Sequence, residues 1–371
     1  MPSSHFSTVN LTITIARNLY LTVSTPNKKP YKFVACMSRM VAVDDWAMVI
    51  FAMEAFRYFG GDLAVAPVEC AIKEVMKLLR LYEKDGILKI QPAFKPRQIR
   101  ELFYNTNQQT EYSNQISNSH ECFYEFKESA EFISFPDWDD ILMGYRQDSR
   151  FSTYYDMFAP LIQQYPNAAA FSLNRYHTAL LTPVHELVNF SLANVLRKAV
   201  YSKTSVVPKM VIRPKLVASC WIHTSKVMEN DTYFEMQTSA ASFAHLNYAL
   251  LTKHNATVKP GNSKSSFLDP DVLDSTFRSM LKRHSFVFEN ANFPFVSSFR
   301  GLISSCYRKI TKDFVEDGLI YCPSIASCKY KTQNVAVEKS KTTYKEQVTA
   351  GPFLWIERKD SYFIADNKGC L

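Results

Sequence analysis

From residue 31 onward, apolar residues alternate between short continuous runs and longer stretches with helical spacing. The short runs are typical of buried strands, and they lie at 31–37, 62–68 and 87–92. The stretches between them, 46–59 and 69–84, each place apolar residues along one face of a helix. Strands and helices therefore alternate with short connections, which predicts a parallel sheet with right-handed crossovers.

The ends of the two predicted helices carry the residues that usually cap helices. Asp44 or Asp45 precedes the first helix, where a carboxylate can accept hydrogen bonds from the first turn. Gly60-Gly61 end the first helix and Gly86 ends the second, because glycine readily adopts the left-handed conformation of a helix terminus.

The pattern continues with fewer clear signals. A polar helix is expected over 107–128, and a capped helix over 270–283 follows a linker at 259–267. Further strands are expected at 131–136, 165–173 and 218–226, and 205–217 is a basic segment rich in residues that favour strands.

Three carboxylates follow the strand predicted at 131–136, in the sequence Asp137-Trp138-Asp139-Asp140. In open α/β sheets, ligands bind at the carboxyl ends of the strands. Asp137 and Asp139, spaced i, i+2 there, can reach one Mg²⁺ or Mn²⁺ ion, which would hold the diphosphate of a nucleotide. The alternative is a polar turn in which an aspartate caps a helix.

Other candidate residues lie further along the chain. Lys209 and Arg213 belong to a basic strand and are candidates for contacting a diphosphate, or else are surface charges on an edge strand. His245 lies among apolar residues, where a histidine is either a core residue or a metal ligand.

Motifs and charge exclude several classes of protein. The chain has no G-x-x-x-x-G-K-[ST], G-x-G-x-x-G, G-x-S-x-G, H-E-x-x-H or kinase signature. An Asp-x-Asp without a glycine-rich phosphate loop is typical of many sugar-nucleotide transferases. The net charge of +8 is scattered apart from a mild lysine cluster between 329 and 345, and no nucleic-acid-binding module accompanies it. We therefore expect no nucleic-acid partner.

Cysteines and sequons favour the lumen of the secretory pathway. Eight cysteines contain no C-x-x-C pair, and Cys306, Cys322 and Cys328 are placed so that they can form disulfides. Asn-x-Ser/Thr sequons begin at residues 10, 189, 230 and 255. The chain nevertheless has no apolar segment of transmembrane length and no signal-peptide pattern. Either it is part of a longer anchored protein, or the lumenal interpretation is wrong.

Several stretches resemble glycosyltransferase family 92, in particular its nematode branch. The resemblance runs in colinear order from about residue 30 to about residue 257, and its most specific run is KESAEFISFPDWDD. Other matching stretches are YKFVACMSRM, DDWAMVIFAMEAFRYFGGDLAV, LLRLYEKDGILKIQP, YPNAAAFS, FSLANVLRKA, KMVIRPKLVASCWIH and FAHLNYALL.

The resemblance implies a GT-A fold: α/β, with a Rossmann-like mixed sheet flanked by helices. It also implies a metal-dependent, inverting transfer of a hexose, typically galactose, from a UDP-sugar to a glycan, with Mn²⁺ or Mg²⁺ as cofactor. Family members are usually type II membrane proteins of the Golgi, so a membrane anchor is expected that this chain does not contain. We expect the chain to be divided into three parts. Residues 1–29 are an N-terminal segment of uncertain order, residues 30–257 form the GT-A domain, and residues 258–371 form a C-terminal subdomain or extension.

The resemblance also suggests roles for individual residues. Asp137 and Asp139, with Asp140 beside them, take the metal and diphosphate role. His245 resembles the late metal or diphosphate ligand of GT-A enzymes, although Leu246-Asn247 replace the aromatic residue and arginine that follow it in the family. Arg39, in YKFVACMSRM, is assigned to the nucleotide-sugar-binding site.

Two further positions are less defined. Glu186 is the candidate general base, which an inverting transferase needs to take the proton of the acceptor hydroxyl. Trp221 and His223 match a Trp-Ile-His element of the family to which the sequence assigns no role.

Two other functions remain open. A diverged, inactive member would bind a glycan or a nucleotide sugar without turning it over. A hydrolase with paired carboxylates is disfavoured, because Asp137 and Asp139 are too close in sequence to flank a glycosidic bond from opposite faces.

Overall fold

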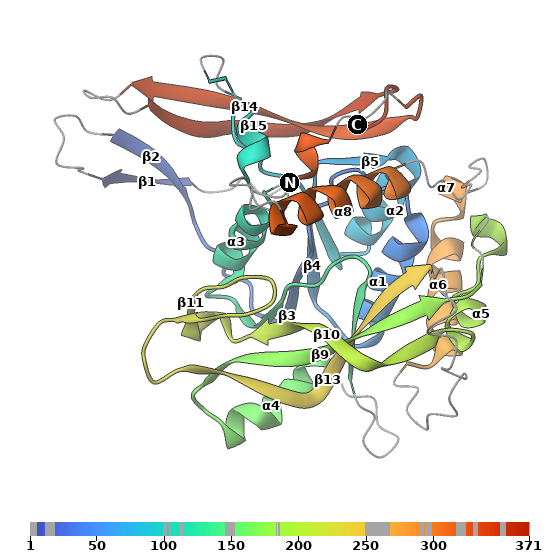
Figure 1. The fold of residues 1–371 in the computed structure, drawn as a ribbon. Coiled ribbons are helices and arrows are strands. Elements are labelled where there is room, and N and C mark those ends of the chain that lie inside the picture. The colour runs from blue at the N-terminus through green and yellow to red at the C-terminus, as the bar shows by residue number, and fades with distance from the viewer. Residues whose placement is uncertain are drawn as a thin grey trace.

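The protein is organised around one eight-stranded sheet (Figure 1). Its computed structural model describes residues 6–11, 19–98, 102–103, 105–110, 114–144, 153–182, 184, 186–248, 268–288, 293, 299–316, 324–328, 333–348 and 354–370. In sheet order the strands are β6 (Leu88–Pro92), β4 (Leu63–Val68), β3 (Tyr31–Cys36), β7 (Ala130–Ser134), β10 (Val200–Ile212), β9 (Ala168–Leu180), β13 (Phe234–Tyr248) and β8 (Asp140–Gly144).

The sheet is mixed. Strands β6, β4, β3 and β7 are mutually parallel, as the alternation of strands and helices predicts. Strand β10 runs antiparallel to both β7 and β9, whereas β13 is parallel to β9 and antiparallel to β8. The predicted class, α/β with a mixed sheet flanked by helices, is confirmed.

Successive side chains on β3 point to opposite faces of the sheet and belong to two separate cores. Phe33 and Ala35 belong to the larger cluster, which includes residues of α1 (Trp46–Tyr58), α2 (Lys73–Lys84) and α4 (Tyr154–Gln164). Val34 and Cys36 belong to the smaller cluster under α3 (Gln115–Phe126). The sheet is therefore covered on both faces, which explains the continuous apolar runs of its parallel strands.

Helix α1 begins as predicted, with the Asp45 carboxylate accepting a hydrogen bond of 3.1 Å from the Met48 amide. Every residue from 46 to 56 is buried, because the helix packs against α2, β8 and α6 (Pro270–Arg283). The predicted single apolar face is thus too narrow a description of this helix.

The second predicted helix, 69–84, starts later than expected. Residues Cys70–Ile72 form a short strand, β5, and α2 begins only at Lys73. β5 pairs with β14 (Val337–Val348), so a partner more than 260 residues away overrides the local helical pattern.

Three other boundaries also differ. The helix expected over 107–128 is divided into a 3-10 turn, η1 (Thr106–Gln109), and α3. Strands β9 and β10 begin or end well outside the predicted runs, because they pair with each other, and β9 also pairs with β13, over long stretches with register shifts. The strand expected at 218–226 is replaced by β11 (Val217–Ser219), a turn that carries His223, and β12 (Val227–Met228).

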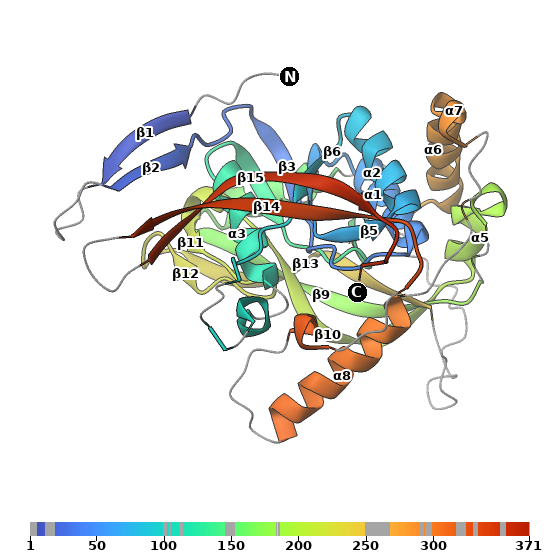
Figure 2. The same cartoon turned by 90° about the horizontal axis from the view of Figure 1, so that it is seen from above.

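The C-terminal residues lie against the sheet domain at several points (Figures 1 and 2). Helix α6 is capped by Asp269 as predicted and packs on α1. Helices α7 (Ser285–Phe288) and α8 (Arg300–Glu316) and the turn η6 (Ile325–Ser327) follow it. Strand β14 forms a long hairpin with β15 (Leu354–Asp366), and this hairpin extends from β5. The linker expected at 259–267 lies outside the described residues.

The N-terminal segment contains a hairpin of β1 (Phe6–Leu11) and β2 (Leu19–Ser24). Within the ranges that the structure describes, no helix is both long enough and apolar enough to cross a membrane.

Three disulfides join distant segments. Cys36–Cys122 connects β3 to α3, Cys70–Cys370 ties β5 to the residues after β15, and Cys306–Cys328 closes a short loop between α8 and η6. The third is one of the pairings expected from the sequence, while Cys322 lies outside the described residues. Cys220 is buried and unpaired.

We expect the Cys70–Cys370 bond to stabilise the fold more than the Cys306–Cys328 bond. The sequence separations are 300 and 22 residues, and a longer loop loses more entropy in the unfolded chain when it is closed. The double substitution C70S/C370S should lower the free energy of unfolding by about 2 kcal/mol more than C306S/C328S does. Denaturant unfolding of both variants measures the difference, and equal losses would contradict the prediction.

Candidate functional site

The acidic cluster lies at the carboxyl edge of the sheet, as its position in the sequence predicts. β7 ends at Ser134, and β8 begins at Asp140 after a tight turn in which the Asp140 amide donates to the Asp137 carbonyl at 3.0 Å. The indole of Trp138 anchors this turn by donating to the Ser38 carbonyl, at 2.9 Å, in the segment that follows β3. The turn therefore holds the three carboxylates against the ends of two parallel strands.

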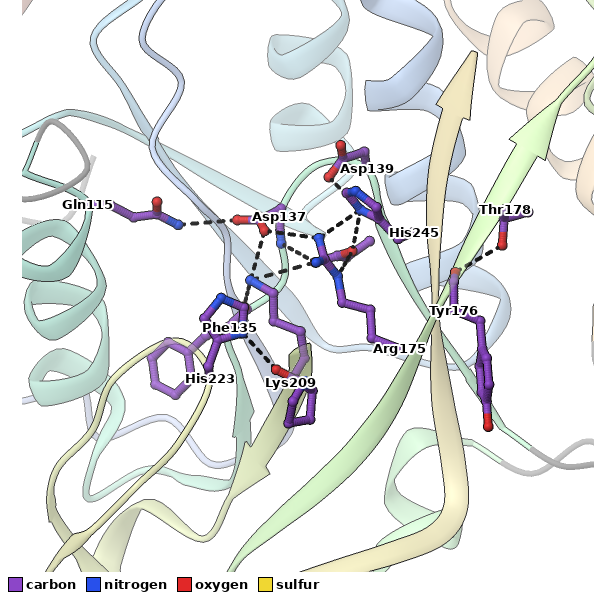
Figure 3. A network of polar contacts seen from close by, with 12 residues as sticks. Gln115, Phe135, Asp137, Asp139, Arg175, Tyr176, Thr178, Lys209, His223 and His245 are labelled. Carbon is purple, nitrogen blue, oxygen red and sulfur yellow. Dashed lines mark hydrogen bonds and ion pairs between the residues drawn. The ribbon is translucent and has the colours of Figure 1, made fainter. Parts of the chain in front are cut away.

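Asp140 is the buried centre of the cluster, and its side chain is 0% exposed. Its Oδ1 lies 2.7 Å from Arg175 Nε and 3.0 Å from His245 Nδ1, and its Oδ2 lies 3.6 Å from Lys209 Nζ (Figure 3). Burial alone would raise the pKa of this carboxyl, but the hydrogen bond from His245 and the charges of Lys209 and Arg175 outweigh it and lower the pKa below its usual range.

Asp137 points to the other side of the turn. Its Oδ2 lies 2.8 Å from Lys209 Nζ and 3.6 Å from the Arg175 guanidinium, and its Oδ1 accepts from the Gln115 amide at 3.2 Å. Lys209 is itself 0% exposed and also donates to the Phe135 carbonyl at 3.3 Å. It is thus a buried cation that neutralises Asp137 and Asp140 together.

Asp139 is the most accessible of the three carboxylates, with 32% of its side chain exposed, and it lies 3.5 Å from His245 Nδ1. His245 lies on β13 directly opposite Asp140, so the antiparallel pairing of β13 with β8 brings it to the cluster. Burial lowers the pKa of His245, but hydrogen bonds to Asp139 and Asp140 outweigh that effect and raise it to about 9.

Asp139, Asp140 and His245 form a group that can hold a metal ion, since one donor atom from each lies within 4.8 Å of the others. Two carboxylate oxygens and an imidazole nitrogen suit Mn²⁺ or a similar divalent ion. The group expected from the sequence was Asp137, Asp139 and His245. The structure gathers Asp140 with the last two and directs Asp137 to Lys209.

Arg39 lies elsewhere along the same edge. Its guanidinium is 4% exposed and pairs with Glu69, just after β4, and Lys95 pairs with the same carboxylate. Burial lowers the pKa of Arg39 to about 9. Burial, together with the positive charges of Arg39 and Lys339, lowers the pKa of Lys95 to about 8. Arg39 therefore faces the ends of β4 and β6 and has no contact with the acidic cluster.

Two other predicted residues lie away from the cluster. Arg213 donates to the Ala168 carbonyl at 3.1 Å, at the start of β9, whereas Arg175 reaches the cluster from further along that strand. Glu186 is exposed and precedes the turn η3 (Leu187–Asn189), and no contact joins it to the cluster among the described residues. The structure thus brings together Asp137, Asp139, Lys209 and His245, and separates Arg39, Arg213 and Glu186 from them.

Sequence reasoning missed Arg175. The predicted strand stopped at 173, while β9 continues to Leu180 and pairs in parallel with β13, so that Arg175 is opposite Phe243 and His177 is opposite His245. The rings of the two histidines are 5.2 Å apart. The only signal was a single arginine two residues after an apolar run, which is not specific.

His223 also lies near the cluster (Figure 3). Its Nδ1 is 2.7 Å from the Pro208 carbonyl, which fixes the proton on Nδ1, and its ring packs edge-on to Trp221 at 5.3 Å. Burial, with the positive charge of Lys209, lowers the pKa of His223. A neutral imidazole is therefore held beside Lys209.

Comparisons with known proteins give a family. The sequence profile of glycosyltransferase family 92 matches residues 31–283. The glycosyltransferase family 92 protein F59C6.8 of Caenorhabditis elegans is 26% identical over 348 residues, covering 88% of this chain and 66% of its own length. The glycosyltransferase family 92 protein F13G3.3 of the same organism is 23% identical over 320 residues, which cover 81% of this chain and 62% of that protein. The chain therefore spans less than two thirds of the length of these relatives.

Similarity to solved structures is weaker. Residues 1-349 of S. aureus TarS in complex with UDP give a TM-score of 0.33 at 10% identity, covering 58% of this chain and 60% of that chain. The same residues of TarS in complex with UDP-GlcNAc give a TM-score of 0.33 at 11% identity, covering 76% of this chain and 81% of that chain.

We expect Lys209→Met to destabilise the fold strongly. It would leave the buried carboxylate of Asp140 and the neighbouring Asp137 without the buried one of the two cations they share, and breaking a buried ion pair on one side costs about 3–5 kcal/mol. Lys226→Met is the matched control, because Lys226 is 74% exposed and lies 3.7 Å from its partner Glu235. Its loss should cost at most about 1 kcal/mol. Equal unfolding free energies for the two variants would show that Lys209 does not neutralise the cluster.

Proposed function

The chain belongs to glycosyltransferase family 92, and from this we propose that it transfers a hexose from a UDP-sugar to a glycan acceptor at the Asp139–Asp140–His245 cluster. The observation that carries the proposal is the placement of three carboxylates, one imidazole, one buried cation and one partly buried cation at the carboxyl edge of the sheet. That edge is where open α/β sheets bind nucleotides.

The residues present fit a divalent ion, which we propose to be Mn²⁺ or Mg²⁺. Such an ion, when bound, would neutralise the charge that develops on the departing diphosphate. Asp139 is the ligand best exposed to receive it, and His245 approaches Asp139 from the neighbouring strand. Asp137, held by Lys209 and Gln115, would position the donor from the other side of the turn.

The cations supply the second part of the chemistry. Arg175 and Lys209 lie within 4 Å of the carboxylates, where they can also stabilise phosphate oxygens. Arg39 and its partner Glu69 occupy the edge beside β4 and β6, which we propose as the nucleoside end of the donor site. Among the residues that the structure describes, no hydrogen bond or ion pair joins Arg213 or Glu186 to this region, so Glu186 remains a general base proposed from the sequence alone.

Galactose as the sugar, inversion of the anomeric carbon and a Golgi location are proposals that rest on the family resemblance. The three disulfides support an oxidising compartment, since such bonds persist in the secretory pathway and are rare in the cytosol. A membrane anchor would belong to that location.

A binding module without turnover is the second candidate. It is favoured by the fact that Arg175, Lys209 and His245 already pair with the carboxylates, so the cluster is stable without supporting catalysis. Such a module would bind a glycan or a nucleotide sugar; in the second case it agrees with the transferase on nucleotide binding and differs from it on turnover.

Calorimetric titration of UDP tests the proposal. We expect UDP to bind the intact chain in the presence of Mn²⁺ and much more weakly in EDTA. Asp139→Asn should abolish the metal-dependent part, while Asp231→Asn, in an exposed turn, should leave it unchanged.

The release of UDP from UDP-galactose then separates the two candidates. For the transferase, Asp139→Asn should slow release by about 10²–10³-fold, the usual cost of one preorganised electrostatic contact. Metal-dependent UDP binding with no release from any UDP-hexose would favour the binding module. A folded protein that ignores UDP under all conditions would rule out the transferase and a nucleotide-sugar-binding module, and would leave only a module that binds a glycan.

A further inference from the structure

Arg175 makes the same contacts that a metal ion in this site would need. Its Nε lies 2.7 Å from Asp140 Oδ1, and one terminal nitrogen lies 2.7 Å from His245 Nδ1 and 3.6 Å from Asp137 Oδ2 (Figure 3). Asp140 and His245 are two of the three residues in the candidate metal group. The guanidinium therefore lies against two of the three donors.

The contact with His245 is the more telling of the two. With its proton on Nδ1, His245 donates to Asp140 at 3.0 Å; with its proton on Nε2, the bare Nδ1 accepts from Arg175 at 2.7 Å. A single nitrogen cannot do both at once. In the second arrangement, Arg175 engages the lone pair through which Nδ1 would bind a metal.

The charges around the site also indicate that a metal ion and Arg175 compete for the same place. Three carboxylates face the two fixed cations Arg175 and Lys209, so most of their charge is already compensated. A divalent ion bound by Asp140 and His245 would lie a few ångströms from the guanidinium, and two positive charges at that distance in a partly buried site repel each other strongly. Metal and guanidinium are thus expected to exclude each other.

We propose that Arg175 is an internal counter-ion that blocks the metal site until a nucleotide diphosphate arrives, and that it then moves to the phosphates and releases Asp140 and His245. This inference rests on the proposed function and adds a coupling between metal and nucleotide. The planar fork of an arginine matches phosphate oxygens as well as it matches a carboxylate.

Arg175, and not Lys209, is the cation that can move. Its side chain is 12% exposed, and its partners Asp137, Asp140 and His245 are side chains and not main-chain groups. Lys209 has no exposed surface and is also bound to the Phe135 main chain. Lys209 therefore stays as the permanent counter-ion of Asp137 and Asp140.

The coupling has a measurable consequence. If the diphosphate draws Arg175 away, UDP raises the affinity for Mn²⁺, and by linkage Mn²⁺ raises the affinity for UDP by the same factor. Couplings of this kind are typically about 5–150-fold. Without the Arg175 guanidinium, Mn²⁺ should bind by itself and the coupling should fall towards one.

The experiment measures Mn²⁺ binding to the whole chain by calorimetry and by the paramagnetic resonance signal of free Mn²⁺, with and without UDP. The wild type should bind Mn²⁺ weakly alone and at least about 5-fold more tightly with UDP. Arg175→Met should bind Mn²⁺ alone at least about 5-fold more tightly than the wild type, with little further gain from UDP. Arg57→Met is the matched control, since Arg57 pairs with Asp85 at 2.8 Å and shares no partner with the cluster.

Equal Mn²⁺ affinities of wild type and Arg175→Met in the absence of UDP would overturn the proposal, as would undetectable Mn²⁺ binding by both. Arg175→Lys is the second variant, in case the methionine variant does not fold. It keeps the positive charge and should keep Mn²⁺ binding weak. The coupling to UDP should fall, because an ammonium group lacks the planar, forked donors with which a guanidinium binds phosphate oxygens. Tight Mn²⁺ binding by Arg175→Lys would also count against the charge argument.

Failure of the proposed function gives a different result. If UDP binds neither protein under any condition, the nucleotide site is absent. The comparison of Mn²⁺ binding without UDP still decides whether Arg175 blocks the metal site.

Discussion

The burial of one carboxylate, that of Asp140, determines how the second half of the sheet is put together. A charge without exposed surface has to be compensated within hydrogen-bond distance. The compensating groups come from three strands: Arg175 from β9, Lys209 from β10 and His245 from β13. Because these three strands are neighbours in the sheet, the ion pairs also fix their registers, and a slip of one residue would turn each partner to the opposite face.

Local signals predicted the first half of the sheet well and the second half poorly. The helix at 46–59 was found because its cap and its apolar spacing lie within a few residues of each other. The start of the next helix was misplaced, since the strand at Cys70–Ile72 exists only through pairing with β14. Likewise, the position of the carboxylates at a strand end could be predicted from the sequence, whereas Arg175 could not. Its place depends on the register between β9 and β13, which no local pattern reveals.

His245 and the two cations around the carboxylates give the cluster more positive neighbours than a simple metal site requires. Such an arrangement stabilises the protein in the absence of ligand, because no carboxylate is left unpaired in a partly buried place. The same pairs have to rearrange when a ligand with its own charges enters. Stability of the empty site and readiness to bind are therefore opposed here, as is common where function needs charged groups.

The bond between Cys70 and Cys370 makes strands β6 to β10, strand β13 and the C-terminal hairpin part of one covalent ring, while β3, β4 and α1 lie outside it. A protease that cuts an exposed segment anywhere inside this ring opens it without releasing a fragment, because both pieces remain joined through the disulfide. A nicked molecule would keep its two parts at a high effective concentration and in contact with each other. In a compartment rich in proteases, the chain can thus lose its backbone continuity and still remain one molecule.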